Sequence, residues 1–540
     1  MRFITRAIIG LVFLSAATLV KAQFIYTNVN GSVTITGYSG PGGAVTFPAS
    51  IGGLPVTALG TQVFFLNHTV NYTVASVSIP ASITNIQSGA FSYAFGLTAI
   101  TVNPANPVFS SVGGVLFDQS RSTLLAFPGG VTGAYTIPAG VTAIGDDAFF
   151  VSLLTTVNIP SSVASIGITA FGSCPLLTQL NIDPANRAFA SVDGVLYDFT
   201  QTTLLQYPGG LPGPFAIPPT VVNIGSSSFQ SAYGLTSVYL PPSVAGIGSQ
   251  AFSGCSSLQS FNVDPANLVY SSLNGVLFDM ARDTLLIFPG GLGGNYAIPN
   301  GVTTIADGAF NKARVTGVAI PASTTDLSSQ PFYNCSSLLS ISVDPVNSVY
   351  SSLNGVLFDK NQVTLILYPA GLTGSFTIPT SVTTVGTFAF LFSQLSHVTF
   401  PASVSSLQDY ALADCANLAS ATFLGNPPAM DSTVFYGDPN AVLYYLPGAS
   451  GWSTPFNGVP TLLWNAVVYA GPNSPGIQNQ QFGFKVTGTA GLAVVVQGST
   501  NLASPVWLPL QALTLTNGSA YFSEPVNADV PASFFRLSTP

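Results

Sequence analysis

The pattern of apolar and polar positions repeats along most of the chain. An apolar residue followed by proline recurs at spacings of 80 or 81 residues, at Ile79-Pro80, Ile159-Pro160, Leu240-Pro241, Ile320-Pro321 and Phe400-Pro401. A second series keeps the same superperiod, at Ile137-Pro138, Ile217-Pro218, Ile298-Pro299 and Ile378-Pro379. Self-similarity at a fixed period is the signature of a repeat architecture, so we predict four tandem copies of a unit of about 80 residues.

A shorter unit lies inside each copy. It places an aliphatic residue, a tight turn, a small residue and usually phenylalanine in a fixed order, as IQSGAF (86–91), IGDDAF (144–149), IGITAF (166–171), IGSSSF (224–229), IGSQAF (247–252), IADGAF (305–310), LSSQPF (327–332), VGTFAF (385–390) and LQDYAL (407–412). Coils that stack about 4.8 Å apart would align these phenylalanines in one internal column. The pattern therefore predicts a mostly β solenoid.

Each copy also carries an insert of fixed design. The inserts read NPANPVFSSVGGVLFD (103–118), DPANRAFASVDGVLYD (183–198), DPANLVYSSLNGVLFD (264–279) and DPVNSVYSSLNGVLFD (344–359). Two apolar runs flank Gly114, Gly194, Gly275 and Gly355, and the preceding residues are Gly113, Asp193, Asn274 and Asn354. Such dipeptides favour type I′ turns, so we predict a β-hairpin in each insert.

These units resemble the BspA-like leucine-rich repeats of bacterial surface proteins. That family combines an aliphatic-x-aliphatic-Pro strand, an I-G-x-x-A-F turn and a C-x-x-L segment. The cysteine positions hold Cys174, Cys255, Cys335 and Cys415, followed by Leu177, Leu258, Leu338 and Leu418, whereas Ala94 stands there in the first copy. The resemblance covers roughly residues 24–430 and implies an extracellular or surface-exposed solenoid, with some members acting in adhesion.

The rest of the chain divides around this solenoid. We assign 1–22 to a signal peptide, 23–78 to an N-terminal cap and first coil, 79–433 to the leucine-rich-repeat solenoid, 434–464 to a C-terminal cap, 465–481 to a linker and 482–540 to a small C-terminal β-sandwich module. Five short apolar or alternating runs after residue 481 support the last assignment. The module resembles, more weakly, a β module appended to secreted proteins of some environmental bacteria, with surface sorting and carbohydrate contact both open as its role.

The N-terminus and the charge indicate where the protein acts. Basic residues, an apolar run from Ala7 to Val20 and the sequence Val20-Lys21-Ala22 are typical of a secretory signal peptide. We expect a secreted, extracellular or cell-surface protein with no transmembrane segment in the mature chain. Removing the three basic residues of the signal peptide would lower the formal charge from -8 to -11, which disfavours nucleic acid as a partner.

Few residues offer catalytic or metal chemistry. The cysteines lie in equivalent coils, too far apart to form disulfides, so we expect buried free thiols. The histidines are His68 and His397, and we expect His397 to be structural. Aspartates recur in every insert, which favours Asx-type turns, although a calcium role for the DPxN turns stays open. We therefore expect a protein that is not an enzyme and has no cofactor.

A row of side chains remains as a candidate binding face. In the strand of each short unit, the residue between two inward positions faces outward. The row comprises Thr101, Asn158, Asn181, Tyr239, Asn262, Ser342, Thr399 and Thr422. Polar, uncharged side chains suit hydrogen bonding to an extracellular protein or glycan, and a solvated face without a ligand is the alternative.

These features favour a non-enzymatic secreted or cell-surface protein that acts in protein or glycan recognition or adhesion. A structural protein of the envelope or matrix is the alternative, and a polysaccharide-degrading enzyme is the third hypothesis. The sequence leaves the oligomeric state open.

Overall fold

The computed structural model describes residues 23–66, 69–70, 72–471, 474–526 and 533–538, so the predicted signal peptide 1–22 lies outside the described residues. The chain divides into two compact units: residues up to Gly293 with 304–314 and 327–332, and residues 294–303, 315–326 and 333–540. In the described ranges, the regular structure is β except for one 3-10 turn, Thr516–Gly518. No helix there has the length and apolar character needed to cross a membrane.

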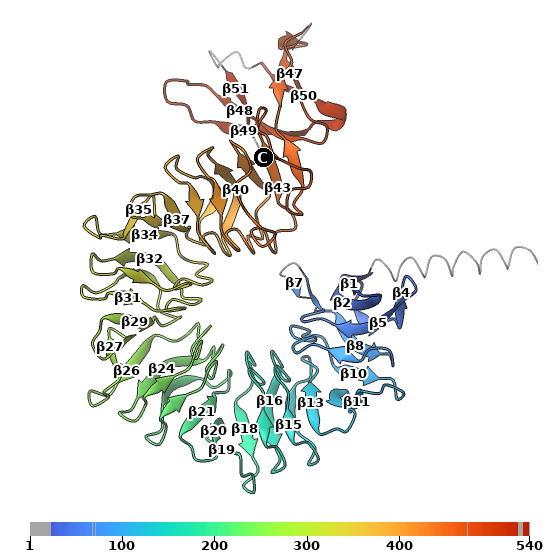
Figure 1. The fold of residues 1–540 in the computed structure, drawn as a ribbon, viewed down its shortest axis with the longest axis vertical. Helices are drawn as coiled ribbons and strands as arrows, with labels where there is room; N and C mark the ends of the chain where they lie inside the picture. The colour runs from blue at the N-terminus through green and yellow to red at the C-terminus, as the bar shows by residue number, and fades with distance from the viewer. Residues whose placement is uncertain (1–22, 67–68, 71, 472–473, 527–532, 539–540) are drawn as a thin grey trace, which may run out of the picture. The chain divides into compact units, whose positions relative to one another are not determined.

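The first unit shows the repeat clearly in residues 123–182, where three coils stack as parallel ladders (Figure 1). One ladder joins β13 (Thr123–Ala126), β15 (Ala143–Ile144) and β17 (Ser165–Ile166), and the other joins β14 (Gly133–Thr136), β16 (Leu154–Ile159) and β18 (Gln179–Ile182). Leu124 pairs with Ile144, and Ile144 pairs with Ile166. Because identical positions pair in successive coils, the predicted solenoid of in-register coils is confirmed.

The same strands recur in the later copies. In the next copy they are β21 (Thr203–Gln206), β22 (Gly213–Ala216), β23 (Asn223–Ile224), β24 (Leu235–Leu240), β25 (Gly246–Ile247) and β26 (Ser260–Val263). They are followed by β29 (Thr284–Ile287), β30 (Gly294–Ala297), β31 (Thr304–Ile305), β32 (Val315–Ile320), β33 (Asp326–Leu327) and β34 (Ser340–Val343). The last copy has β37 (Thr364–Leu367), β38 (Thr373–Thr377), β39 (Thr384–Val385), β40 (Gln394–Phe400), β41 (Ser406–Leu407) and β42 (Ser420–Phe423).

The inserts are antiparallel hairpins, as predicted. They pair β11 (Phe109–Val112) with β12 (Val115–Asp118), β19 (Phe189–Val192) with β20 (Val195–Asp198), β27 (Tyr270–Leu273) with β28 (Val276–Asp279), and β35 (Tyr350–Leu353) with β36 (Val356–Asp359). The central turn residues have positive φ, for example +50° at Asp193 and +82° at Gly194. Type I′ turns require two such residues, so the turn prediction is also confirmed.

Each hairpin tip closes the free edge of the preceding three-stranded sheet. The backbone N–H of Leu180 donates to the carbonyl of Gly194 at 3.0 Å, and that of Ile182 donates to Ser191 Oγ at 3.1 Å. The equivalent backbone bonds are Ile100 to Gly114, Phe261 to Gly275 and Ile341 to Gly355, each 2.8 Å long. Since an open strand edge can pair with other chains, these bonds protect β18 and its counterparts.

The buried aromatic rings form separate stacks of three. Phe127, Phe149 and Phe171 stack with ring centroids 5.1 Å apart at both steps. Equivalent stacks are Tyr207, Phe229 and Phe252, and Phe288, Phe310 and Phe332. The sequence predicts one continuous phenylalanine column, whereas each stack lies within one copy. The first rings, Phe127, Tyr207 and Phe288, are each followed by a Pro-Gly turn. The segment that contains this ring and turn therefore forms a third complete coil of its copy.

The N-terminal segment already contains this architecture. β1 (Phe24–Val29) pairs antiparallel with β2 (Ser32–Tyr38), which pairs in parallel with β5 (Leu54–Leu59). β3 (Gly43–Thr46) starts the second ladder, which continues through β8 (Val74–Ile79) and β10 (Ala99–Val102). The segment 23–78, expected to be a cap and one coil, therefore holds a cap strand and two coils.

The end of the second unit extends its parallel sheet from β42 to β43 (Val442–Tyr445) and β44 (Thr461–Leu463). Two antiparallel sheets follow. One contains β45 (Val467–Val468), β46 (Gly476–Gln478), β47 (Gln481–Thr487) and β50 (Ser519–Pro525), and the other contains β48 (Ala493–Ser499), β49 (Leu508–Thr514) and β51 (Phe534–Ser538). The assignment of these sheets to a β-sandwich module stays a prediction.

The expected linker at 465–481 takes part in the C-terminal sheet. Its strands β45 and β46 both pair with β47. Tyr444 of the solenoid also lies in one buried core with Ala466, Phe484 and Val486. The C-terminal segment is thus packed against the last coils, because its apolar residues share a core with them.

Candidate functional site

The three-stranded sheets bring most of the predicted binding residues into register. Asn158 pairs with Asn181, Tyr239 with Asn262, and Thr399 with Thr422. Thr101 pairs with Ser78, and Ser342 pairs with Ala319. Thr101, Asn181, Tyr239, Asn262 and Ser342 are exposed, whereas Asn158 and Thr399 are partly buried. Polar side chains are therefore aligned in some copies, as Asn158 with Asn181 and Tyr239 with Asn262, whereas in the sheet of β30, β32 and β34 Ser342 lines up with Ala319 and Ala297.

Hydrogen bonds within a row occupy part of its polar capacity. Asn181 Nδ2 donates to Asn158 Oδ1 at 2.9 Å, and Asn158 Nδ2 donates to Thr136 Oγ1 at 3.0 Å. Thr101 Oγ1 donates to the carbonyl of Val77 at 2.9 Å. These bonds orient Thr101, Asn158 and Asn181, so the donors and acceptors of these three side chains have preset positions.

Tyr239 gives its row a distinct character. Its side chain is 40% exposed, and its hydroxyl donates to Asp264 Oδ2 at 2.5 Å. This hydrogen bond raises the pKa of Tyr239 and lowers the pKa of Asp264. The ring is held in place by a charged partner while it remains open to solvent, which suits contact with an apolar or ring-shaped ligand group.

Thr422 is a correction to the predicted face. Its side chain is only 6% exposed, and its hydroxyl has no hydrogen-bond partner among the described residues. Thr422 pairs with Tyr444, which lies in the core shared with the C-terminal segment. The outward position at this end of the solenoid is therefore covered, and Thr422 cannot reach a ligand.

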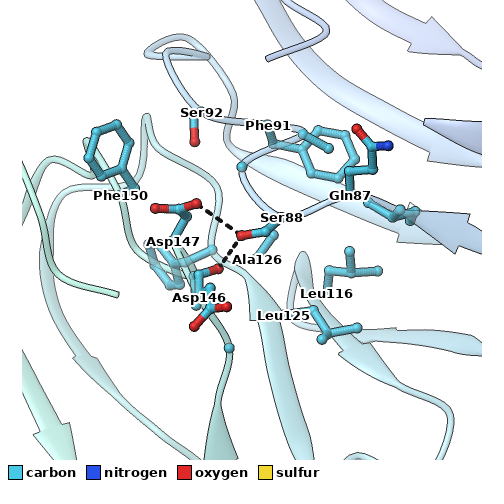
Figure 2. Close-up of a pocket in the computed structure, with 16 residues that line it drawn as sticks. Gln87, Ser88, Phe91, Ser92, Leu116, Leu125, Ala126, Asp146, Asp147 and Phe150 are labelled. Carbon is cyan, nitrogen blue, oxygen red and sulfur yellow. Dashed lines mark hydrogen bonds between the residues drawn. The ribbon is translucent and has the colours of Figure 1, made fainter. Parts of the chain in front are cut away.

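A cavity of about 230 Å³ lies in the first unit between successive copies (Figure 2). Phe91, Leu116 and Leu125 contribute apolar side chains, while Asp146 and Asp147 lie at its polar side (Figure 2). Ser88 Oγ lies 2.9 Å from both the carbonyl of Asp146 and Oδ2 of Asp147, and its one proton serves one acceptor at a time. Asp147 also accepts a hydrogen bond from the Thr169 hydroxyl.

The cavity has a local origin in the sequence. The coil that contains Phe127-Pro128-Gly129-Gly130 lacks the I-G-x-x-A-F turn. The turns of the two neighbouring coils, at 86–91 and 144–149, therefore face each other across it. Ser88 and Asp147 join these two turns directly, and the equivalent turns of the next copy are also joined, by Ser173 Oγ and Ser231 Oγ at 3.0 Å. Because its carboxylates already accept structural hydrogen bonds, the cavity suits a small polar group at most.

The recurring aspartates stabilise turns. Asp183 Oδ1 accepts from the backbone N–H of Ala185 at 2.8 Å, and Asp198 Oδ1 accepts from that of Thr203 at 2.7 Å. The other inserts repeat both bonds. The predicted Asx-type turns are confirmed. In the part of the chain that the structure describes, no three His, Cys, Asp or Glu side chains group as metal ligands.

Sequence reasoning missed the role of the asparagine in the same motif. Asn186 is buried, and its Nδ2 donates to the carbonyls of Pro160 and Val163 at 3.1 and 2.9 Å. Its Oδ1 accepts from the backbone N–H groups of Ala188 and Phe189. The other inserts place Asn106, Asn267 and Asn347 in the same way. Recurrence of asparagine at the fourth position of every DPxN motif was the available signal.

All four cysteines are buried and none forms a disulfide, as predicted. The thiols of Cys174 and Cys255 donate to the carbonyls of Phe149 and Phe229, each at 3.0 Å. Burial raises the pKa of Cys174 to about 11 and that of Cys255 to about 12. Since the thiolate is the reactive form, these thiols act as structural donors inside the coils.

His397 lies in β40 beside a potential nucleophile. Its Nδ1 lies 2.7 Å from Ser420 Oγ, and its Nε2 lies 3.1 Å from Thr399 Oγ1. Both His397 and Ser420 are buried, and burial lowers the pKa of His397. No substrate can reach this pair without opening the core, so the predicted structural role of His397 fits its position. His68 lies outside the described residues.

The fold and repeats define a leucine-rich-repeat solenoid. The chain matches the family model described as BspA type leucine rich repeat region in six copies, over residues 58–191, 214–274, 294–375 and 371–447. These ranges cover more than half of the chain, so the protein belongs to the BspA-type leucine-rich-repeat family. No curated relative matches it.

Several solved bacterial structures are similar to this chain. A leucine-rich cell surface protein of Faecalibacterium prausnitzii A2-165 is 26% identical, with a TM-score of 0.30, over 60% of this chain and 93% of that one. The pneumococcal vaccine antigen PcpA is 17% identical, with a TM-score of 0.31, over 79% and 92%. A leucine-rich repeat protein of Eubacterium ventriosum ATCC 27560 is 22% identical, with a TM-score of 0.30, over 48% and 76%.

Proposed function

We propose that this protein is a non-enzymatic recognition or adhesion protein that acts outside the cell or at its surface. Membership of the BspA-type family and the predicted signal peptide support the location. The observation that carries the binding role is the alignment of outward polar side chains on two of the three-stranded sheets, Asn158 with Asn181 and Tyr239 with Asn262. The partner is an extracellular protein or glycan.

Uncharged amides and hydroxyls in register suit an extended partner. Successive strands of a sheet lie about 4.8 Å apart, so a row of three side chains spans about 10 Å. Tyr239 and Asn262 form the row with the exposed aromatic ring. A ligand that lies across these strands meets a flat ring whose hydroxyl is already held by Asp264, which limits the entropy lost on binding.

The test is a binding array of matrix proteins and glycans with the mature chain. We expect saturable binding to at least one class, weakened by Tyr239→Ala and Asn262→Ala. Thr220→Ala, at an exposed turn residue outside the row, is the matched control and should bind as the parent does. Absence of saturable binding on both arrays, or equal binding by all variants, would contradict the proposal.

A structural role in the envelope or matrix is the second candidate, because the insert turns carry exposed apolar side chains. Leu268 and Val346 are among the most exposed large apolar residues of the described chain. Light scattering of the purified protein tests this role. Concentration-dependent assembly that is lost in Leu268→Ser and Val346→Ser would favour it, and a strict monomer would exclude it.

A further inference from the structure

The outer face of the C-terminal sheet formed by β45, β47 and β50 carries a row of aromatic and basic side chains. The backbone N–H of Tyr469 donates to the carbonyl of Lys485, and Lys485 pairs with Tyr521 on the next strand. Side chains that pair directly across strands lie on the same face of a sheet. Tyr469, Lys485 and Tyr521 therefore form one row, and all three are exposed.

The opposite face of the same sheet lies in the core. Phe484, Val486 and Phe522 are buried there with Tyr444 of the solenoid. Phe484 and Phe522 also contact Phe535 of the second sheet, at centroid distances of 5.8 and 5.6 Å. The alternation along β47 thus turns Lys485 away from the packed side, and its side chain is exposed among the described residues.

Glycines allow both tyrosine rings to lie close to the backbone. A Cβ atom at Gly483 would lie 2.7 Å from the Tyr521 hydroxyl, and one at Gly471 would lie 2.2 to 2.5 Å from the Tyr469 ring. No larger residue fits under either ring in this arrangement. The rings remain 43% and 50% exposed, so each presents a broad apolar surface that rests on the backbone.

The row has the chemistry of a carbohydrate platform. The C–H face of a sugar ring packs against an aromatic face, and the tyrosine hydroxyl and neighbouring polar groups can bond its hydroxyls. Two strand spacings separate Tyr469 and Tyr521 by about 10 Å, so the platform suits an oligosaccharide. Lys485 Nζ lies over the Tyr469 ring, 5.7 Å from its centroid, so the ammonium group and this ring are in cation–π contact.

Charge indicates which carbohydrates fit. Lys485 supplies a positive charge on this face. The chain as a whole carries a formal charge of -8, so attraction of an anionic polymer is local to this row and opposes the net charge. A cation on the same face as the exposed Tyr521 ring complements a sugar carboxylate and offers less to a neutral sugar. We propose that the face of Tyr469, Lys485 and Tyr521 binds an acidic polysaccharide, independently of the polar rows of the solenoid.

The test is affinity electrophoresis of the full mature chain in gels that contain polygalacturonate, with hydroxyethyl cellulose as the neutral polymer. We expect retardation by polygalacturonate, and affinity about tenfold lower in Tyr469→Ala and Tyr521→Ala. Tyr521→Phe should retain most of the affinity because it keeps the ring. Lys485→Gln should weaken binding and reduce its salt dependence.

Matched measurements separate this site from the solenoid. Tyr239→Ala and Asn262→Ala should leave polygalacturonate binding unchanged, and the near-UV circular dichroism of each C-terminal variant should retain the signal of the buried aromatic core. The proposal would be overturned by absence of retardation of the parent chain, or by retardation of the Tyr469→Ala and Tyr521→Ala variants equal to that of the parent. Binding to anionic phospholipid vesicles in place of polygalacturonate would overturn it as well.

Discussion

Replacement of Asn186 by alanine should destabilise its copy far more than loss of a surface turn residue. Asn186 makes four hydrogen bonds to backbone groups, of which those to Val163 and Phe189 are both 2.9 Å long. The substitution would leave the Val163 carbonyl and the N–H groups of Ala188 and Phe189 without this partner, whereas the Pro160 carbonyl keeps its hydrogen bond from the Val163 N–H at 3.3 Å. An unpaired buried polar group costs about 1–3 kcal/mol. At about 1 kcal/mol for each of the three groups, the loss is about 3 kcal/mol.

Asp183→Ala is the matched control because it lies in the same turn. Asp183 makes one exposed hydrogen bond to the N–H of Ala185, so its loss should cost about 1 kcal/mol. Asn186→Asp provides a further comparison, since it keeps an acceptor for Phe189 but turns an oxygen toward the carbonyl of Val163. It should be at least as destabilising as Asn186→Ala near neutral pH.

Native-state hydrogen exchange measured by mass spectrometry is the appropriate assay, because a repeat protein can open locally without global unfolding. Peptides that cover residues 155–200 should report a large loss of protection in Asn186→Ala, whereas peptides from the C-terminal sheets should not change. Equal protection in Asn186→Ala and Asp183→Ala would refute the reasoning.

Three other measurements test the remaining features. Gly194→Ala should destabilise the protein more than Gly213→Ala: both glycines have positive φ, but a Cβ at Gly194 would lie 2.7 Å from the Thr178 carbonyl and one at Gly213 meets nothing within 4 Å. The φ strain costs about 1 kcal/mol in each, so equal denaturation midpoints would show that the hairpin contact contributes nothing. Burial raises the pKa of the Asp438 carboxyl to about 8, the charge of Asp414 adds to this effect, and the Cys415 amide offsets part of it. The folded protein then binds more protons than the unfolded chain, so its free energy of unfolding should fall by a few kcal/mol as the pH rises from about 4 to about 8. Urea denaturation of Asp438→Asn should lack this fall, and an identical pH profile in the variant would argue against a buried neutral carboxyl. A thiol reagent such as Ellman's should leave the cysteines of the native protein unmodified at pH 8 and react with all four in denaturant, while rapid labelling of the native chain would show that the coils open readily.

The repeat was predictable because its inward positions recur with little variation. The spacing of the Ile-Pro and I-G-x-x-A-F patterns determines which residues stack, and Ile144 and Ile166 pair as this spacing predicts. The hairpins were equally accessible, since Asp193-Gly194 and its equivalents favour one turn type. Local chemistry and long-range periodicity point to the same structure in these segments.

The third coil of each copy was harder to recognise. Phe127 occupies the same stack as Phe149 and Phe171. Unlike them, it does not end an I-G-x-x-A-F sequence, and it is followed by Pro128 and Gly129. Its aromatic residue comes at the end of a strand, so the sequence indicates only a strand and a turn. Stacking in three dimensions is what shows that this segment is a coil.

The sequence predicted which residues of the candidate face align on neighbouring strands, but it did not predict which of them are exposed to solvent. Alternation along a strand identifies Asn181 and Thr422 as equivalent outward positions, and the ladder places both as expected. Whether such a position reaches solvent depends on segments that are distant in sequence. Tyr444 and the C-terminal core cover the Thr422 side chain. This contact cannot be inferred from the repeat pattern.

The hairpin that closes each three-stranded sheet has an evolutionary consequence. The hairpin tip at Gly194 bonds to β18, the edge strand of the sheet that precedes it in the chain. A duplicated segment of about 80 residues that contains both the sheet and the hairpin therefore includes the hydrogen bonds that pair its own edge strand. A protein that gains or loses one such segment would therefore keep the edge strands of its sheets hydrogen-bonded. Lengthening by duplication is therefore structurally tolerated in this architecture, and the number of copies can vary between relatives while each copy keeps its internal packing.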